Sequence, residues 1–291
     1  MIENDINSMN INWFPGHMAK TRRILVESLK LVDVVIELLD ARIPQSSKNP
    51  DIDKLLNNKP KVVVLNKSDL ADISVSKKWQ EYFNKTGQKV IFMDSIKGTG
   101  IRELNSVIYD IMKEKIERDK KRGIINKPIR SMVVGIPNVG KSAFINKIAG
   151  KKIAKTGDRP GVTREKQWIR LNEKIQLLDT PGILWPKLER MSVALNLAFT
   201  GAIKDEVYDT VEVSFVLLEK LRDMYQKQLK ERYKIQEDIN DKKGYEILDI
   251  IAKKRGCILS GGNIDYERIS AILLDELRGG KIGRISLEVP N

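Results

Sequence analysis

Apolar and polar residues follow different patterns in the two parts of the chain. In the first part, short apolar runs rich in β-branched residues are separated by longer segments with helical spacing. The runs are residues 32–39, 61–66, 90–94 and 131–135. Such runs are typical of parallel strands that are buried on both faces. Because strands and helices alternate, we predict an α/β fold with a doubly wound, mostly parallel sheet.

Two further strand-like runs follow, and after them the pattern changes. Residues 166–171 and 174–179 are joined by Asn172 and Glu173, which predicts a hairpin. From about residue 190 the strand pattern gives way to the apolar spacing of three and four that is typical of helices. This spacing covers residues 211–236, 245–255 and 264–278.

A chain of 291 residues accommodates two domains. We expect an α/β domain over residues 1–187 and an all-helical domain over residues 188–291. The single cysteine, Cys257, excludes a disulfide framework, and its simplest role is that of a small buried apolar residue. The N-terminus carries acidic residues and no apolar run, and no stretch of about 18 apolar residues follows. We therefore expect a cytoplasmic protein that does not associate with membranes.

The formal net charge of +13 is unevenly distributed. Residues 186–291 carry 18 basic and 18 acidic side chains, so the excess lies in the first part of the chain. It is densest in residues 113–130, with eight basic and three acidic side chains, and in residues 147–174, with nine and three. Such stretches either form a nucleic-acid-binding surface or are solvated faces without a partner.

The segment Gly135–Ser142 is a complete G-x-x-x-x-G-K-S motif between an apolar strand and a helical segment. This is the context in which the motif binds phosphates. The glycines allow backbone amides to close around the phosphates, and the Lys141 ammonium binds the β and γ phosphates. The Ser142 hydroxyl is a ligand for Mg²⁺. The segment therefore predicts a P-loop.

A second phosphate-side element lies about 40 residues further on, where Asp179 and Gly182 form a D-x-x-G turn at the end of a strand-like run. The aspartate can hold Mg²⁺ through water, and the glycine amide can contact the γ phosphate. Alone, this tetrapeptide would be an ordinary turn. Its distance from the P-loop is typical of P-loop nucleoside triphosphatases, so the two motifs support each other.

Asn66, Lys67 and Asp69 belong to an N-K-x-D segment that ends another apolar strand. The Asp69 carboxylate can accept hydrogen bonds from the guanine ring N1–H and from the exocyclic amine. Adenine cannot offer this pair of donors. Leaving that buried group unpaired would cost about 1 to 3 kcal/mol, so GTP is favoured over ATP. The same tetrapeptide also makes an ordinary turn. Residues 94–98 follow the next strand, and we expect them to form a loop that contacts the edge of the guanine base. A backbone amide near Ile96 would lie at guanine O6.

The order of these motifs is circularly permuted. In ordinary GTPases the P-loop comes first, whereas here residues 66–69 and 95–97 precede residues 135–142. The same sheet can form if the customary ends are joined and new ends open after the phosphate-side switches. Residues 113–130 are the expected joining linker. The segment after Gly182 then leads directly into the helical domain, so hydrolysis could reorient that domain.

Two further segments complete the pattern: residues 12–18 (NWFPGHM) and residues 40–44 (DARIP). With the motif order and the helical C-terminal part, they resemble the YlqF/YawG class of circularly permuted GTPases over nearly the whole chain. The resemblance implies a GTPase that is stimulated by the large ribosomal subunit. It implies a factor that binds a late precursor of this subunit in the GTP state and leaves on hydrolysis.

The resemblance also implies partners. They are 23S-type ribosomal RNA and ribosomal proteins, bound by a monomer. The C-terminal helical domain is expected to bind RNA, although its charge is balanced; the local candidates are residues 253–255, Arg278, Lys281 and Arg284. If phosphate contacts dominate affinity, the basic surface of the first domain should contribute heavily.

The site residues comprise those predicted from the motifs and those that the resemblance adds. GTP or GDP would be bound by Asn66, Lys67, Asp69, Ser95, Ile96, Lys97, Pro137, Asn138, Val139, Gly140, Lys141, Ser142, Ala143, Thr163 and Gly182. Mg²⁺ would be held by Ser142, Thr163 and Asp179, and K⁺ by Asn138. The expected catalytic residues are His17, Lys141 and Thr163. Thr156 is an alternative to Thr163 in the first switch, residues 156–164, and Thr163 could instead cap a strand.

The residue after the D-x-x-G turn is Ile183, where a water-positioning glutamine often stands. Isoleucine cannot orient water, so catalysis needs another group, in the chain, from K⁺ or from the particle. His17 is the sole histidine, and a neutral imidazole can position water near pH 7. Alternatively, residues 13–16 form a packed or RNA-contacting arm, and His17 is a structural hydrogen-bonding residue.

Two functional classes follow from these residues. One is a molecular switch, in which GTP closes the switches on an RNA–protein particle and hydrolysis releases it. The other is a binding module, in which nucleotide stabilises an RNA-docking shape and turnover is incidental. A membrane-directed or transfer-RNA-directed GTPase is disfavoured, because the chain lacks an apolar anchor and a modification domain.

Overall fold

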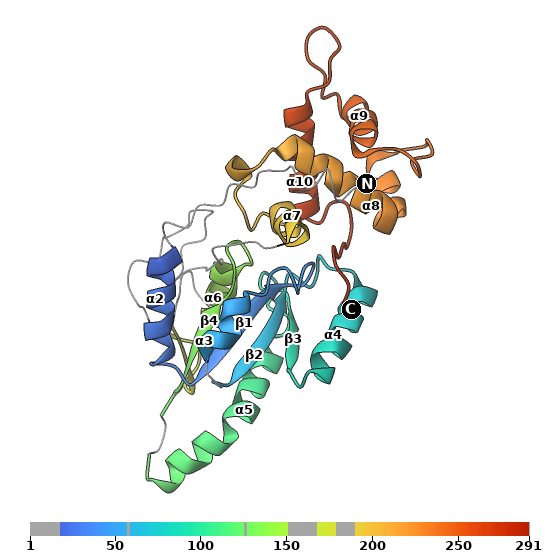
Figure 1. Ribbon diagram of the computed structural model, residues 1–291. Coiled ribbons are helices and arrows are strands. Elements are labelled where there is room, and N and C mark those ends of the chain that lie inside the picture. The colour runs from blue at the N-terminus through green and yellow to red at the C-terminus, as the bar shows by residue number, and fades with distance from the viewer. Residues whose placement is uncertain (1–17, 57–58, 125–126, 151–167, 179–189, 291) are drawn as a thin grey trace. The chain divides into compact units, whose positions relative to one another are not determined.

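The computed structural model describes residues 18–56, 59–124, 127–150, 168–178 and 190–290 (Figure 1). The first part of the chain contains α2 (Met18–Leu29), β1 (Val34–Asp40), α3 (Pro50–Leu56), β2 (Lys61–Asn66), α4 (Ile73–Lys85), β3 (Val90–Met93), α5 (Ile101–Lys121), β4 (Ile129–Val134), α6 (Lys141–Ala149), β5 (Trp168–Arg170) and β6 (Ile175–Leu178). The later part contains α7 (Met191–Phe199), the 3-10 turn η1 (Asp205–Val207), α8 (Thr210–Tyr233), α9 (Gly244–Arg255) and α10 (Tyr266–Arg278). Within the described residues, each predicted strand and helix is found, with bounds that differ by up to three residues.

The strands of the described residues form one sheet in the order β3-β2-β1-β4-β6-β5. β1 pairs in parallel with β2 and β4, β2 pairs with β3, and β4 pairs with β6. β5 is antiparallel to β6, as the predicted hairpin requires. Because the central strands are parallel, the carboxyl ends of β1, β2, β3 and β4 lie at the same edge of the sheet. The loops that follow these strands carry most of the predicted site residues.

Helices cover both faces of this sheet. All seven residues of β1 are buried, which explains its nearly uninterrupted apolar sequence. On one face, α2 and α3 pack against a cluster that includes Val35, Met132 and Leu178. α4 packs on the same face of the neighbouring strands, against Leu39 and Leu65. α5 and α6 bury apolar stripes of their own and cover the second face. The doubly wound α/β fold is confirmed.

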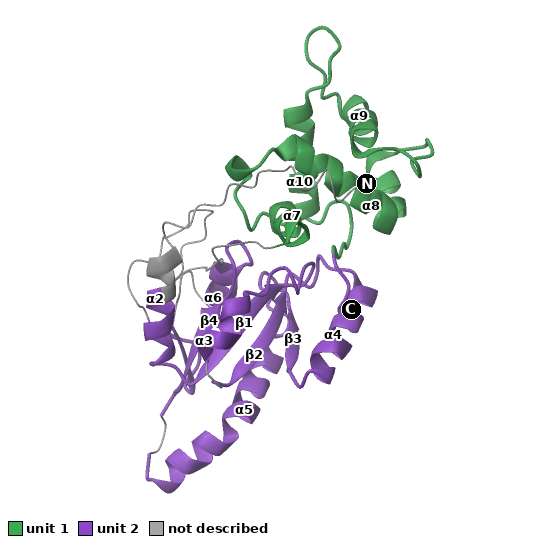
Figure 2. Ribbon diagram, in the orientation of Figure 1, with its two compact units in different colours: residues 1–13, 188–287 green, residues 14–187, 288–291 purple. Residues whose placement is uncertain are grey.

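The chain divides into two compact units (Figure 2). Of the described residues, 190–287 form the helical unit, and 18–178 together with 288–290 form the unit of the sheet. The sequence prediction placed the last residues with the helical domain, whereas they pack on the sheet unit. Their anchor is Glu288, whose carboxylate accepts hydrogen bonds from the Ser46 backbone N–H at 2.9 Å and the Ser46 hydroxyl at 2.6 Å. The Trp79 indole N–H donates to the Glu288 carbonyl at 3.3 Å.

The helical unit is held together by close contacts between its helices. A Cβ added at Gly244, the first residue of α9, would lie 2.1 Å from the carbonyl oxygen of Phe215 in α8, so only glycine fits there. The hydroxyl of Tyr225 in α8 donates to the Ser286 carbonyl and accepts from the Ser286 N–H, both at 3.0 Å. Cys257 is buried, as expected. Among the described helices, none has the length and apolar character required to cross a membrane.

Candidate nucleotide-binding site

The predicted P-loop joins the end of β4 to the start of α6. A Cβ at Gly135 would lie 2.6 Å from the carbonyl oxygen of Leu38 in β1. Gly140 has a φ of +98°, and a Cβ there would lie 2.4 Å from the side-chain nitrogen of Asn66. Side chains would therefore collide with β1 and with the loop after β2. The two glycines allow the P-loop to approach β1 and the last residue of β2 closely.

Lys141 and Ser142 are the first two residues of α6. The Lys141 ammonium donates to the carbonyl oxygens of Gly135, at 3.1 Å, and Ile136, at 2.7 Å, so it lies across the loop. The backbone N–H groups of the first helical turn attract phosphate oxygens. The Ser142 hydroxyl is a hard oxygen ligand of the kind that Mg²⁺ prefers. This arrangement fits a phosphate group with its metal ion.

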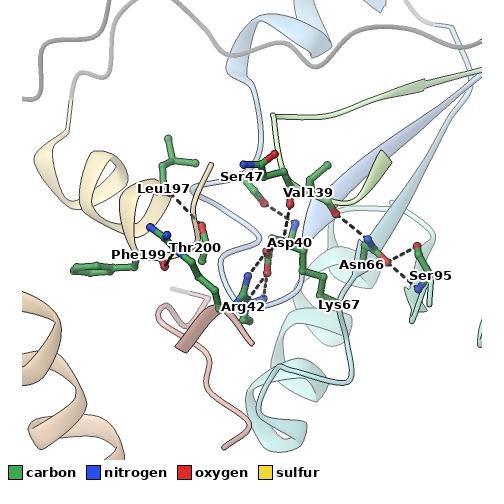
Figure 3. Close-up of polar contacts among 12 residues, drawn as sticks. Asp40, Arg42, Ser47, Asn66, Lys67, Ser95, Val139, Leu197, Phe199 and Thr200 are labelled. Carbon is green, nitrogen blue, oxygen red and sulfur yellow. Dashed lines mark hydrogen bonds and ion pairs between the residues drawn. The ribbon is translucent and has the colours of Figure 1, made fainter. Parts of the chain in front are cut away.

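Asn66 connects the P-loop with the two loops predicted to read guanine (Figure 3). Its side chain is 1% exposed. The amide nitrogen donates to the carbonyl oxygen of Val139 at 2.8 Å. The amide oxygen accepts from the Ser95 N–H at 3.2 Å and from the Ser95 hydroxyl at 2.6 Å. The motifs around residues 66, 95 and 139 are therefore brought together by one buried amide.

Lys67 forms a second connection to the P-loop. Its ammonium donates to the carbonyl oxygen of Asn138 at 2.7 Å and lies 3.1 Å from a carboxylate oxygen of Asp40. Lys67 and Asn138 have φ values of +57° and +56°, in the left-handed region that side chains rarely adopt. Such conformations cost about 1 to 3 kcal/mol and cluster at functional sites. The hydrogen bond thus joins two strained residues.

Asp40, the last residue of β1, is a buried anion at this edge of the sheet (Figure 3). Its carboxylate accepts from the Arg42 guanidinium at 2.8 and 3.0 Å and from the Arg42 backbone N–H at 3.0 Å. Burial raises the pKa of Asp40, but the charges of Arg42 and Lys67 outweigh it and hold this pKa well below its ordinary value. Asp40 is therefore ionised.

The sequence assigned no function to Asp40 and Arg42. A signal was present, because two oppositely charged residues stand at and just beyond the end of a mostly apolar strand. In the sheet, Asp40 is the register partner of Asn66. That register places the carboxylate beside the residue that follows Asn66.

The loop after β3 is shaped by Asp94, another residue without a predicted role. Its carboxylate accepts from the backbone N–H of Ile96 at 2.9 Å and of Lys97 at 3.0 Å. The Ile96 side chain is 80% exposed. The Ile96 N–H, which was expected at guanine O6, thus donates to the Asp94 carboxylate in this structure. Asp69, expected to read the guanine edge, is partly exposed in the loop after β2.

Thirteen of the predicted site residues are described: Asn66, Lys67, Asp69, Ser95, Ile96, Lys97, Pro137, Asn138, Val139, Gly140, Lys141, Ser142 and Ala143. All belong to the three loops just described or to the first turn of α6. His17, Thr156, Thr163, Asp179, Gly182 and Ile183 lie outside the described residues. Within the described ranges, no three His, Cys, Asp or Glu side chains gather into a metal site. Of the residues predicted to hold Mg²⁺, only Ser142 is among those that the structure describes.

Two of the basic residues that are RNA candidates make ion pairs within the helical unit. The Arg278 guanidinium contacts the Asp205 carboxylate at 2.7 and 2.9 Å and donates to the Ala198 carbonyl at 3.0 Å. The Arg255 guanidinium contacts the Glu276 carboxylate at 3.0 Å. Lys253, Lys254, Lys281 and Arg284 are exposed.

Comparison with known proteins gives consistent matches. Residues 130–253 match the family described as 50S ribosome-binding GTPase. A protein named Ribosome biogenesis GTPase A from Bacillus cereus is 50% identical over 282 residues, which span 97% of this chain and 95% of that protein. One of the same name from Thermotoga maritima is 31% identical over 280 residues, spanning 96% and 95%.

Two solved structures are also similar. The GDP-bound structure of TM YlqF has a TM-score of 0.69 at 28% identity and covers 92% of this chain and 99% of that chain. GNP-bound YlqF from T. maritima has a TM-score of 0.65 at 28% identity and covers 94% and 99%. The likeness extends over both units of the chain.

Proposed function

The chain belongs to the ribosome biogenesis GTPase A family and hydrolyses GTP, and from this premise we propose that it acts in the late maturation of the large (50S) ribosomal subunit. In the GTP state it binds the precursor particle in the cytoplasm, and hydrolysis releases it. The observation that carries the proposal is the junction of P-loop and guanine loops around Asn66 in a chain half identical to a ribosome biogenesis GTPase.

The three loops are assigned to the guanine nucleotide. Lys141 and the amides at the start of α6 bind the β and γ phosphates, and Asp69 accepts from the guanine edge. Ser142, with Thr163 and Asp179, holds Mg²⁺. When bound, Mg²⁺ neutralises charge on the β and γ phosphates. Attack of water on the γ phosphorus breaks its bond to the bridging oxygen, giving GDP and phosphate, and Lys141 stabilises the charge that develops on that oxygen.

Asn138 is the proposed ligand of K⁺. It lies in the P-loop, next to the residues that enclose the phosphates, and a cation there could supply charge that an arginine finger gives elsewhere. We expect hydrolysis to slow by at least about 10-fold when Na⁺ replaces K⁺ at equal ionic strength. An Asn138→Ala variant should lose this dependence. Equal rates in K⁺ and Na⁺ would rule out the K⁺ site.

His17 is proposed to position the attacking water, because Ile183 cannot do so. A His17→Ala variant should bind GTP and particles normally and hydrolyse GTP at least about 100-fold more slowly on the particle. Unchanged stimulated turnover would rule out this role and favour the structural one.

Thr163 is proposed as the switch ligand of Mg²⁺ and the γ phosphate, and Thr163→Ala should weaken GTP binding more than GDP binding.

Particle binding tests the proposed function directly. The protein would be sedimented with large-subunit precursors, mature large subunits or small subunits, each with a non-hydrolysable GTP analogue, GDP or no nucleotide. We expect co-sedimentation with the precursor in the analogue state and loss of binding with GDP. Equal binding in all nucleotide states would contradict a switch, and binding to small subunits alone would contradict the target.

A further inference from the structure

In the ion pair between Asp40 and Lys67, Lys67 belongs to the proposed nucleotide site, whereas Asp40 has no role assigned so far. Its geometry is well defined nevertheless: Asp40 is 2% exposed, and its carboxylate oxygen lies 3.1 Å from the Lys67 ammonium. The same ammonium donates to the Asn138 carbonyl in the P-loop. One buried carboxylate therefore holds the cation that bridges the guanine loop and the P-loop.

Asp40 is itself held rigidly on every side. Its backbone N–H donates to the Ser47 hydroxyl at 3.0 Å, and the next backbone N–H, of Ala41, donates to the Asn66 carbonyl at 2.8 Å. Arg42 grips the carboxylate with two guanidinium nitrogens and its own backbone N–H. A lysine side chain is long and flexible, whereas the Asp40 carboxylate is held by three hydrogen bonds from Arg42. The anchor thus fixes where the ammonium lies.

The ion pair stabilises a backbone arrangement that is unfavourable by itself. Lys67 and Asn138 both have left-handed φ values, which are unfavourable for residues with side chains. Without the bridge, the loops would relax toward ordinary conformations and would have to be re-formed on each binding of nucleotide. Pre-organisation of this kind increases affinity because the ordering cost has already been met.

We propose that Asp40 is a positioning residue for guanine-nucleotide binding, which acts through Lys67 to keep the guanine loop and the P-loop in one arrangement. This inference rests on the proposed nucleotide site. Arg42 balances the charge of Asp40, so that the buried carboxylate remains ionised and available to Lys67. The nucleotide is contacted by Lys67, and Asp40 contributes at a distance.

A double-mutant cycle on GDP affinity tests the proposal. The Kd of a fluorescent GDP analogue would be measured for the full-length wild type, Asp40→Asn, Lys67→Met and the double variant. Asp40→Asn should raise Kd about 10-fold, mainly through faster dissociation, which corresponds to about 1.4 kcal/mol. In the Lys67→Met background the same change should alter Kd by less than about two-fold, because its route of action is already lost.

Asp53→Asn is the matched control, since Asp53 also pairs with lysines, Lys48 and Lys61, but lies half-exposed away from the loops. It should leave Kd unchanged. An unaltered Kd in Lys67→Met would overturn the proposed site itself. Two results would overturn only the positioning role. In the first, Lys67→Met raises Kd and Asp40→Asn leaves it unchanged. In the second, both substitutions raise Kd and their effects multiply in the double variant.

Asp40→Asn leaves Arg42 buried without its carboxylate and can unfold the protein. Asp40→Asn/Arg42→Met removes both charges and replaces the single variant in the cycle if thermal unfolding without nucleotide shows that loss. The prediction is unchanged: a higher Kd when Lys67 is present, and no further rise when Lys67→Met is combined with the other two substitutions. Multiplying effects in this second cycle would equally overturn the proposal.

Discussion

Gly140 and Gly150 stand at the two ends of α6 and offer a matched pair at the scale of single residues. Both have positive φ, +98° and +66°, but a Cβ at Gly140 would meet the Asn66 amide at 2.4 Å, whereas no atom of the described residues lies within 4 Å of a Cβ at Gly150. Gly150→Ala adds only backbone strain, about 1 kcal/mol. Gly140→Ala adds that strain and also displaces the buried Asn66.

We therefore predict that Gly140→Ala abolishes measurable GTP binding and lowers the melting temperature, and that Gly150→Ala lowers the melting temperature slightly and binds GTP normally. Both variants would be measured by nucleotide titration and thermal unfolding. Normal GTP affinity in Gly140→Ala would contradict the close approach of the P-loop to Asn66.

Glu276 in α10 gives a pH-dependent prediction. It accepts hydrogen bonds from Arg232 at 2.9 Å and from Arg255 at 3.0 Å. Burial raises the pKa of Glu276, but the hydrogen bonds and the arginine charges outweigh it and lower this pKa below its ordinary value. The ionised carboxylate therefore stabilises the fold above the ordinary glutamate pKa of about 4.3, and this stabilisation is lost as pH falls through the lower folded value.

Glu276→Gln should cost about 1 to 3 kcal/mol of unfolding free energy at pH 7 and progressively less below pH of about 4. The exposed Glu267→Gln, on the same helix, is the control and should cost less than about 1 kcal/mol, because it removes only a first-turn charge. Thermal unfolding of the full chain across pH would measure both. A difference between wild type and Glu276→Gln that persists unchanged in acid would show that the charge is not the cause.

At the scale of elements, the strands were predictable because burial on both faces requires apolar runs. α7 was not predicted, because Ala194 to Phe199 are all buried and an all-round apolar helix has no polar face to reveal its period. In the site, Gly140, Lys141 and the residues around Asn66 were predictable since each motif is local in sequence. The role of Asp40 was not, because its contact with Lys67 arises only when separate loops meet. Asp94 received no role of its own, although its contacts with Ile96 and Lys97 are local.

The C-terminal tail is a further element that sequence could not place, since its contacts with Ser46 span 242 residues. Glu288→Ala would leave the buried Ser46 N–H and hydroxyl without this acceptor, which costs about 1 to 3 kcal/mol. We predict faster hydrogen exchange in residues 43–47 and a lower melting temperature. Val289→Ala, at an exposed neighbouring position, should change neither. Unchanged exchange in Glu288→Ala would contradict an anchoring role for the tail.

At the scale of the whole molecule, the permuted order of motifs changes the connections of the sheet but not the site. The strand order β3-β2-β1-β4-β6-β5 places the loops after β2, β3 and β4 at one edge, although the guanine loops come first in the chain. Motif order could be read from the sequence. The return of the last residues to the unit of the sheet could not, because no periodic pattern accompanies it.

The most direct test of the proposed function is GTP hydrolysis by the purified protein in K⁺ buffer, alone and with large or small ribosomal subunits, with ATP as the nucleotide control. We expect slow hydrolysis by the protein alone, strong stimulation by large subunits, no stimulation by small subunits and no turnover of ATP. No stimulation by large subunits, with GTP binding intact, would contradict a particle-activated switch. It would favour a module that binds the particle and turns over GTP incidentally.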